Sequence, residues 1–127
     1  MKSEWKKAWA DAESSMKMAI VRRDEGRCRI CKRGGTRRNP LQVHHALAKR
    51  GKKSVFFNPT NLITLCSACH QQATNDWHDM NARVVTSIVR ECGIDLVTEV
   101  LEAARKTKKH SFAELVDIQK DFDSRWV

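Results

Sequence analysis

Apolar side chains recur at every third or fourth position over residues 3 to about 24. On an α-helix this spacing gathers them on one face, which predicts a long amphipathic helix at the N-terminus. That face carries Trp5, Trp9, Ala12, Met16, Ala19 and Ile20. We expect the face to pack on the rest of the domain, and the alternative is a homodimer contact through the two tryptophans, which lie one helical turn apart. Gly26 is expected to end the helix.

The pattern changes to alternation in the middle of the chain. Residues 41–47 predict a short strand with Leu41, Val43 and His45 on one face and Gln42 and His44 on the other. Residues 61–65 predict the return strand of a hairpin. A basic loop and the apolar run Val55-Phe56-Phe57 lie between the two strands.

Helical periodicity returns after the hairpin. We expect one helix from Ser67 to about Asp79 and a second from Ala82 to Cys92, capped by Gly93. Asp95 is expected to cap a third helix, and a capping box from Ser111 to Glu114 should begin the last. One side of that last helix carries Phe112, Leu115, Ile118 and Phe122. These elements together predict an α+β fold, in which a long N-terminal helix and several C-terminal helices flank a small hairpin.

Four of the five cysteines form two C-x-x-C pairs, separated by residues 32–65. They are Cys28, Cys31, Cys66 and Cys69. Two such turns can complete a tetrahedron of sulfurs around Zn²⁺, and a closed four-thiolate site stabilises structure and leaves no position for substrate. The alternatives are four unrelated core cysteines, or a redox pair, which would require a neighbouring βαβ pattern. Cys92 is expected to be a small buried apolar residue.

The net charge of +9 is concentrated in one segment. Residues 22–53 hold twelve Lys or Arg against two acidic residues, so this segment carries +10 and the remaining 95 residues carry −1. A one-sided excess of this kind indicates a phosphate backbone as the partner, and the alternative is a basic surface that only aids solubility. The expected DNA-binding residues are Arg33, Arg37, Arg38, Lys49, Arg50, Lys52 and Lys53.

Membrane insertion is not expected. The chain has no run of about 18 apolar residues, and its first residues lack the apolar stretch of a signal peptide. Thiolates available for zinc fit a reducing compartment, so we expect a cytoplasmic protein of a bacterial or phage-infected cell.

The residues between the two cysteine pairs carry a more specific signal. Val43-His44-His45 lies in the middle, and Asn61-Leu-Ile-Thr-Leu-Cys-x-x-Cys-His70 closes the stretch. In order and spacing, these motifs resemble the zinc-containing branch of the HNH endonuclease family, over about 45 of 127 residues. The resemblance implies a ββα-metal core and hydrolysis of phosphodiester bonds in DNA.

The resemblance also implies roles for four residues. His45 corresponds to the general base that takes a proton from water. His44 and His70 correspond to ligands of a catalytic divalent cation, and Asn61 corresponds to the asparagine whose amide braces the histidine-bearing loop. Some members carry a further metal-binding histidine at the position of Thr74. Water and phosphate oxygens would then complete the coordination, which suits Mg²⁺ or Mn²⁺, and Asp76 and His78 are weaker candidates to reach the site.

The C-terminal segment has a fainter resemblance to the NinG/Rap phage recombination nucleases, through Gly93 to Glu102 and Lys109 to Phe122. This resemblance implies nicking of branched recombination intermediates. The alternatives are an HNH nuclease of phage packaging or restriction, and a zinc-stabilised DNA-binding module without catalysis. We expect one compact domain in three parts: an N-terminal helix at 1–27, a zinc-stabilised nuclease core at 28–80 and a helical extension at 81–127.

Overall fold

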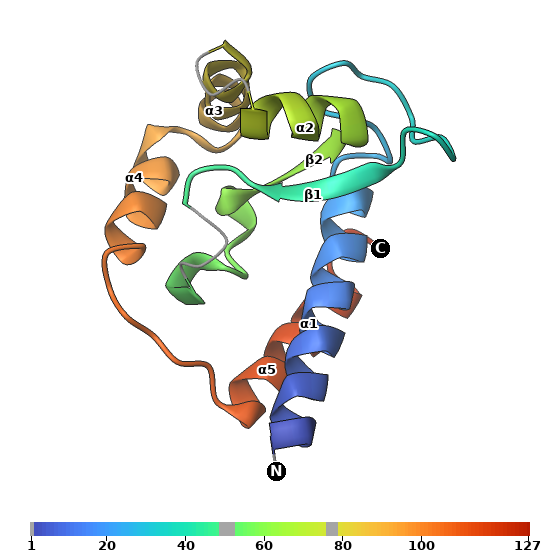
Figure 1. Ribbon diagram of the computed structural model, residues 1–127. Helices are drawn as coiled ribbons and strands as arrows, with labels where there is room; N and C mark the ends of the chain where they lie inside the picture. The colour runs from blue at the N-terminus through green and yellow to red at the C-terminus, as the bar shows by residue number, and fades with distance from the viewer. Residues whose placement is uncertain (1, 49–52, 76–78) are drawn as a thin grey trace.

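The computed structural model describes residues 2–48, 53–75 and 79–127, and its fold is α+β. A two-stranded antiparallel hairpin lies at the centre, and helices surround it (Figure 1). The elements in chain order are α1 (Lys2–Arg23), β1 (Leu41–His45), the 3₁₀ turns η1 (Lys53–Val55) and η2 (Pro59–Asn61), β2 (Leu62–Cys66), α2 (Ser67–Asn75), α3 (Asp79–Cys92), α4 (Ile94–Ala103) and α5 (Phe112–Ser124).

The long helix α1 packs along α5, so the first and last helices of the chain lie side by side, and the N- and C-termini lie apart (Figure 1). The apolar face predicted for α1 is buried here, with Met16 and Ile20 fully enclosed against Leu115 and Phe122 of α5. The predicted tryptophan pair also packs inside the chain. Trp5 stacks on Trp9 with ring centroids 5.5 Å apart, and Trp9 contacts Phe56.

Strand β2 joins two apolar clusters. All five of its residues are buried; Leu62 belongs to the cluster under α1 and α5, whereas Ile63 and Leu65 belong to a second cluster that contains three cysteines and the inner face of α3. The strands pair with His44 opposite Ile63 and His45 opposite Leu62. The hairpin therefore holds the histidines between the two cores.

Several predicted boundaries shift. The strands span Leu41–His45 and Leu62–Cys66 rather than 41–47 and 61–65, because Asn61 belongs to the 3₁₀ turn before β2. Helix α2 is described as far as Asn75, and its expected end near Asp79 is not tested, whereas α3 already includes Asp79 and so begins before the expected start at Ala82. Residues 76–78 lie outside the described part of the chain.

Two helix starts have opposite outcomes. The capping box of the last helix is confirmed, with Ser111 accepting from the Glu114 backbone N–H and Glu114 accepting from that of Ser111. The prediction that Asp95 caps α4 is wrong. Gly93, at φ 88°, is the N-cap and supplies no side-chain hydrogen bond, so Asp95 lies in the first turn. Phe112 is also not part of the buried side of α5, since it is 52% exposed.

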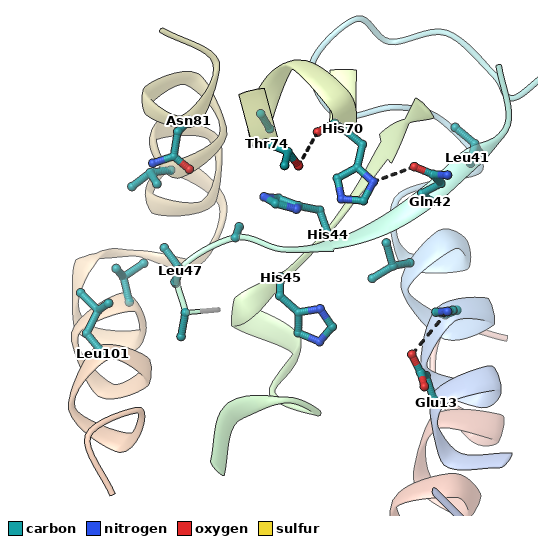
Figure 2. Close-up of a pocket in the computed structure, with 17 residues that line it drawn as sticks. Glu13, Leu41, Gln42, His44, His45, Leu47, His70, Thr74, Asn81 and Leu101 are labelled. Carbon is teal, nitrogen blue, oxygen red and sulfur yellow. Dashed lines mark hydrogen bonds and ion pairs between the residues drawn. The ribbon is translucent and has the colours of Figure 1, made fainter. Parts of the chain in front are cut away.

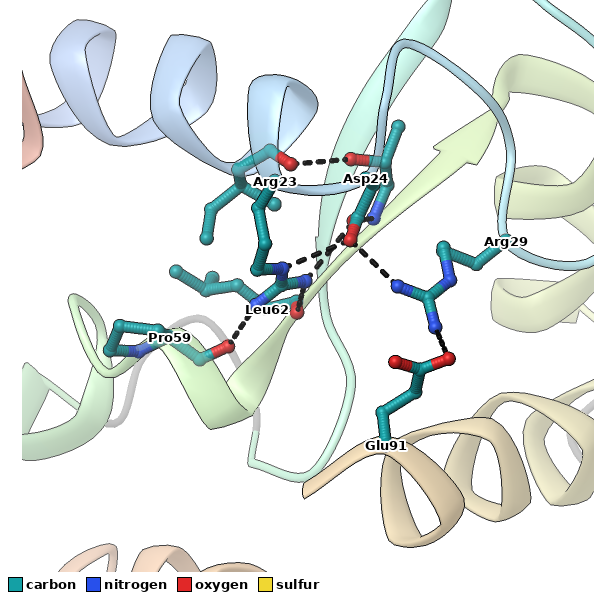
Figure 3. Close-up of polar contacts among 8 residues, drawn as sticks. Arg23, Asp24, Arg29, Pro59, Leu62 and Glu91 are labelled. Carbon is teal, nitrogen blue, oxygen red and sulfur yellow. Dashed lines mark hydrogen bonds and ion pairs between the residues drawn. The ribbon is translucent and has the colours of Figure 1, made fainter. Parts of the chain in front are cut away.

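A buried carboxylate holds the end of α1 against the hairpin (Figure 3). Asp24 accepts the Thr64 backbone N–H at 2.9 Å and binds the guanidinium groups of Arg23 and Arg29, also at 2.9 Å. Burial by itself would raise the pKa of Asp24, but Arg23 and the hydrogen bonds from Thr64 outweigh it and hold the pKa below its usual value. Arg29 in addition pairs with Glu91 of α3. One carboxylate thus joins α1, β2 and the turn between the first two cysteines.

Among the described residues, no helix combines the length and the apolar character that a membrane crossing requires. The expected division of the domain into three parts, at residues 27 and 80, stays a prediction. The second of these boundaries, at residue 80, lies within α3.

Candidate active site and structural metal site

The four cysteines of the two C-x-x-C pairs come together, as the spacing predicted. Their sulfurs all lie within 4.8 Å of one another, and the Sγ atoms of Cys31 and Cys66 are 3.7 Å apart. A tetrahedral zinc with Zn–S bonds of about 2.3 Å requires sulfurs about 3.8 Å apart. Each pair also forms the same turn, in which the backbone N–H of Cys31 or Cys69 points at the sulfur three residues earlier. This donor set is consistent with a structural zinc.

The negative charges of the four thiolates favour a bound cation in the cluster. Burial opposes ionisation of Cys66, but the Cys69 backbone N–H and the Asn39 side chain lower the pKa of Cys66 to about 6. Burial and the neighbouring sulfurs instead raise the pKa of Cys69. Four thiolates this close repel one another unless a bound metal balances their charge.

The three sequence-predicted histidines line one cleft of about 920 Å³ between α1, β1, α2, α3 and α4. Consecutive residues of β1 line the cleft, so side chains from both faces of the strand reach it. His44 points toward α2, where its ring centroid lies 4.9 Å from that of His70 (Figure 2). His45 points to the opposite face of the strand, and its Nε2 is 3.1 Å from the backbone oxygen of Phe56. The predicted alternation of the two histidines is confirmed.

The His44 and His70 rings are held neutral at physiological pH. Burial, and then the nearby charges of His70 and His45, lower the pKa of His44 to about 4. Burial also lowers the pKa of His70. Neutral imidazoles keep a nitrogen lone pair for a metal, so this pair can bind a divalent cation.

Gln42 was not expected to take part in the site. Its Oε1 lies 2.6 Å from Nδ1 of His70 (Figure 2). An amide oxygen only accepts, so Nδ1 carries the proton and the lone pair is on Nε2. The sequence held a signal for this contact, because Gln42 lies two positions before His44 and so shares its face of the strand.

Asn61 makes the bracing hydrogen bonds that the resemblance implies. Its Oδ1 accepts the backbone N–H groups of Leu47 at 2.8 Å and Ala48 at 2.9 Å, and its Nδ2 donates to the backbone oxygen of Val55 at 3.3 Å. The side chain is fully buried. It therefore joins the segment that follows the histidine pair to the segment that carries Phe56.

Of the remaining predicted residues, Thr74 lines the cleft, and the others lie at exposed positions or outside the described residues. The Thr74 hydroxyl donates to the His70 backbone oxygen at 3.0 Å. The side chains of Arg33, Arg37, Arg38 and Lys53 are exposed on the loops before β1 and β2. Lys49, Arg50, Lys52, Asp76 and His78 lie outside the described residues.

The HNH endonuclease family model matches residues 28–76. This segment contains both cysteine pairs, the histidine pair, Asn61 and His70. Over these residues the chain is similar to the HNH endonucleases, which indicates a nuclease or DNA-binding function. No curated protein and no solved structure matches the chain. The resemblance of the C-terminal segment to the NinG/Rap nucleases stays a prediction.

Proposed function

We propose that this protein is a metal-dependent DNA endonuclease whose hydrolytic centre is the cleft between β1 and α2. The observation that carries the proposal is the meeting of three histidines in one cleft. His44 and His70 face each other with ring centroids 4.9 Å apart, and His45 lines the same cleft from the neighbouring position of β1.

His45 is the proposed general base. A backbone carbonyl accepts and never donates, so the 3.1 Å contact with Phe56 favours a proton on Nε2 of His45. The lone pair is then on Nδ1, which can take a proton from water. The water oxygen forms a bond to phosphorus as the bond from phosphorus to the 3′ oxygen breaks. The products are a 5′-phosphate and a 3′-hydroxyl, with the leaving oxygen protonated by solvent.

His44 and His70 are the proposed ligands of Mg²⁺ or Mn²⁺. Their fit rests on two neutral rings that face each other, one of them oriented by Gln42. When bound, the cation would stabilise the charge that develops on the phosphate oxygens and the leaving oxygen. The contribution of Asn61 is positional, because its hydrogen bonds to Leu47, Ala48 and Val55 set the backbone on both sides of the site.

A plasmid-nicking assay with Mg²⁺ or Mn²⁺, compared with the same zinc-loaded protein without added Mg²⁺ or Mn²⁺, tests the proposal. We predict that His45→Ala abolishes nicking, while zinc content and DNA affinity stay near wild type, because a general base acts on water and not on the thiolates. Nicking by this variant at more than a tenth of the wild-type rate would remove His45 from the role. Wild-type protein that binds DNA and never nicks it would support the alternative of a binding module without catalysis.

The C-terminal resemblance favours branched recombination intermediates of a phage as the substrate. The matching test compares the nicking rate on a four-way junction with that on a linear duplex of the same sequences. Equal rates would favour the alternatives of packaging or restriction. We place this activity in the cytoplasm, where a reducing medium preserves the four thiolates.

A further inference from the structure

A second cleft, of about 500 Å³, lies between the first cysteine turn and the outer side of α3. Four of its lining residues are cationic, and Glu91 is its only acidic residue among those described. The cations are Arg29 and Lys32 from the cysteine turn and Arg83 and Arg90 from α3. We refer to this cleft as the α3 groove.

Most of the positive charge in the α3 groove is uncompensated. Arg29 is already paired, through Asp24 and Glu91. Lys32, Arg83 and Arg90 are exposed and form no ion pair with any other described residue. An excess of three unpaired cations with no carboxylate left to balance them favours an anionic ligand.

The spacing on α3 favours a ligand with several anionic groups. Arg83 and Arg90 are seven residues apart, so they lie on the same face of the helix but about 10.5 Å apart along its axis. Thr86 and Ser87 lie between them, and within the described structure their hydroxyls have no hydrogen-bond partner. A helical hydroxyl commonly donates to the carbonyl four residues earlier, as that of Thr98 does at 2.8 Å. The two arginines and two hydroxyls therefore form a row of donors for more than one phosphate.

The same helix lines both clefts. Asn81 and Val85 of α3 face the histidine cleft, whereas Arg83, Thr86 and Arg90 face the α3 groove. The two clefts thus lie on opposite sides of α3, about 10–12 Å apart across one helix, so the backbone that flanks DNA held in the histidine cleft can reach the groove. We infer that the α3 groove binds phosphates of the DNA backbone beside the cleaved segment. This inference rests on the proposed function only in taking DNA as the ligand.

Salt dependence of binding tests the groove directly. Each phosphate contact contributes about −0.9 to the slope of log K against log salt on duplex DNA. The double variant Arg83→Gln/Arg90→Gln should therefore flatten the slope by about 1.8 and weaken binding of unrelated sequences alike. The binding of a duplex is measured over a salt series without added Mg²⁺ or Mn²⁺, so that the DNA stays intact.

The matched control is Lys6→Gln/Lys7→Gln, which removes the same charge from exposed positions of α1. Its slope should stay at the wild-type value. An unchanged slope in the α3 double variant, or a change no larger than that of the control, would overturn the inference. Hydrolysis of a small diester, bis(p-nitrophenyl) phosphate, should be equal in wild type and the α3 variant, because this substrate needs only the histidine cleft. A fall in that rate would show that the variant disturbs the histidine cleft, and this result would also overturn the inference.

The two proposals fail separately. A wild-type protein that never nicks DNA, together with a flattened slope in the α3 variant, would remove the endonuclease and leave the groove. Normal nicking by wild type together with an unchanged slope in the α3 variant would leave the endonuclease and remove the groove as a DNA-binding site.

Discussion

Gln42 orients His70 through one short hydrogen bond, with Oε1 2.6 Å from Nδ1. A hydrogen bond of this kind, from the far nitrogen of a metal-binding histidine, sets the tautomer and the direction of the ring. The orientation of the proposed metal site thus depends on a residue that touches neither metal nor substrate, and Gln42 is a positioning residue.

We predict that Gln42→Ala weakens Mn²⁺ binding by about tenfold, in line with the loss of such outer partners at other metal sites. Gln42→Glu should restore much of the affinity, since a carboxylate accepts from the same Nδ1–H. Mn²⁺ affinity is measured by titration, and the ¹⁵N shifts of the His70 ring report its tautomer without any metal. Gln71→Ala, at an exposed position of α2, is the control. An unchanged tautomer and an unchanged affinity in Gln42→Ala would remove Gln42 from this role.

At the scale of elements, local sequence patterns predicted the helices and strands well, but they did not predict the long-range contacts. Alternation along the first strand separated His44 from His45 correctly, because side chains of neighbouring strand residues must point to opposite faces. The capping box at Ser111 is likewise a local signal. The prediction that Asp95 caps α4 was wrong because the helix begins earlier, with Gly93 as its N-cap. The hydrogen bond that the Leu47 backbone N–H donates to Asn61 Oδ1 spans fourteen residues, and only the family resemblance indicated that Asn61 braces this loop.

Asp24 is the clearest case of a residue whose importance no local pattern reveals. In the sequence it is an acidic residue in a basic segment, whereas in the structure it joins α1, β2 and the first cysteine turn through Thr64, Arg23 and Arg29. Partners forty residues away along the chain become neighbours only after the hairpin has packed on α1.

We predict that Asp24→Asn lowers the free energy of unfolding by about 3 kcal/mol, because it leaves buried donors and a guanidinium without a counter-charge. The folded pKa of Asp24 is depressed. Its contribution is therefore fully present above the unfolded value of about 3.9 and is lost as the pH falls through the folded pKa. Urea unfolding from pH 2 to pH 7 should show a constant deficit near neutrality that narrows below about pH 3.9. Asp117→Asn, at an exposed position of α5, is the control. An equal stability of Asp24→Asn and wild type at pH 7 would contradict the prediction.

At the scale of the whole molecule, the four-cysteine cluster and the hairpin depend on each other. Cys66 is the last residue of β2, whose Leu62 packs in one core and whose Ile63 and Leu65 pack in the other. Loss of the metal would free the end of the strand that both cores share. The histidines of the opposite strand are held by the same pairing, with His44 opposite Ile63. A structural metal in this cluster would therefore support the proposed catalytic centre without contacting it.

We predict that Cys66→Ser, or removal of zinc by a strong chelator, unfolds the protein. Structural zinc contributes about 10–16 kcal/mol in small zinc-finger peptides, whereas whole domains are stable by only about 5–15 kcal/mol, so the loss should exceed what the two apolar cores retain. Zinc content and the far-ultraviolet circular dichroism of both proteins decide the matter. Cys92→Ser, which lies outside the cluster of four sulfurs, should keep its zinc and its fold. A folded, zinc-free and active Cys66→Ser protein would show that the four cysteines hold no structural metal.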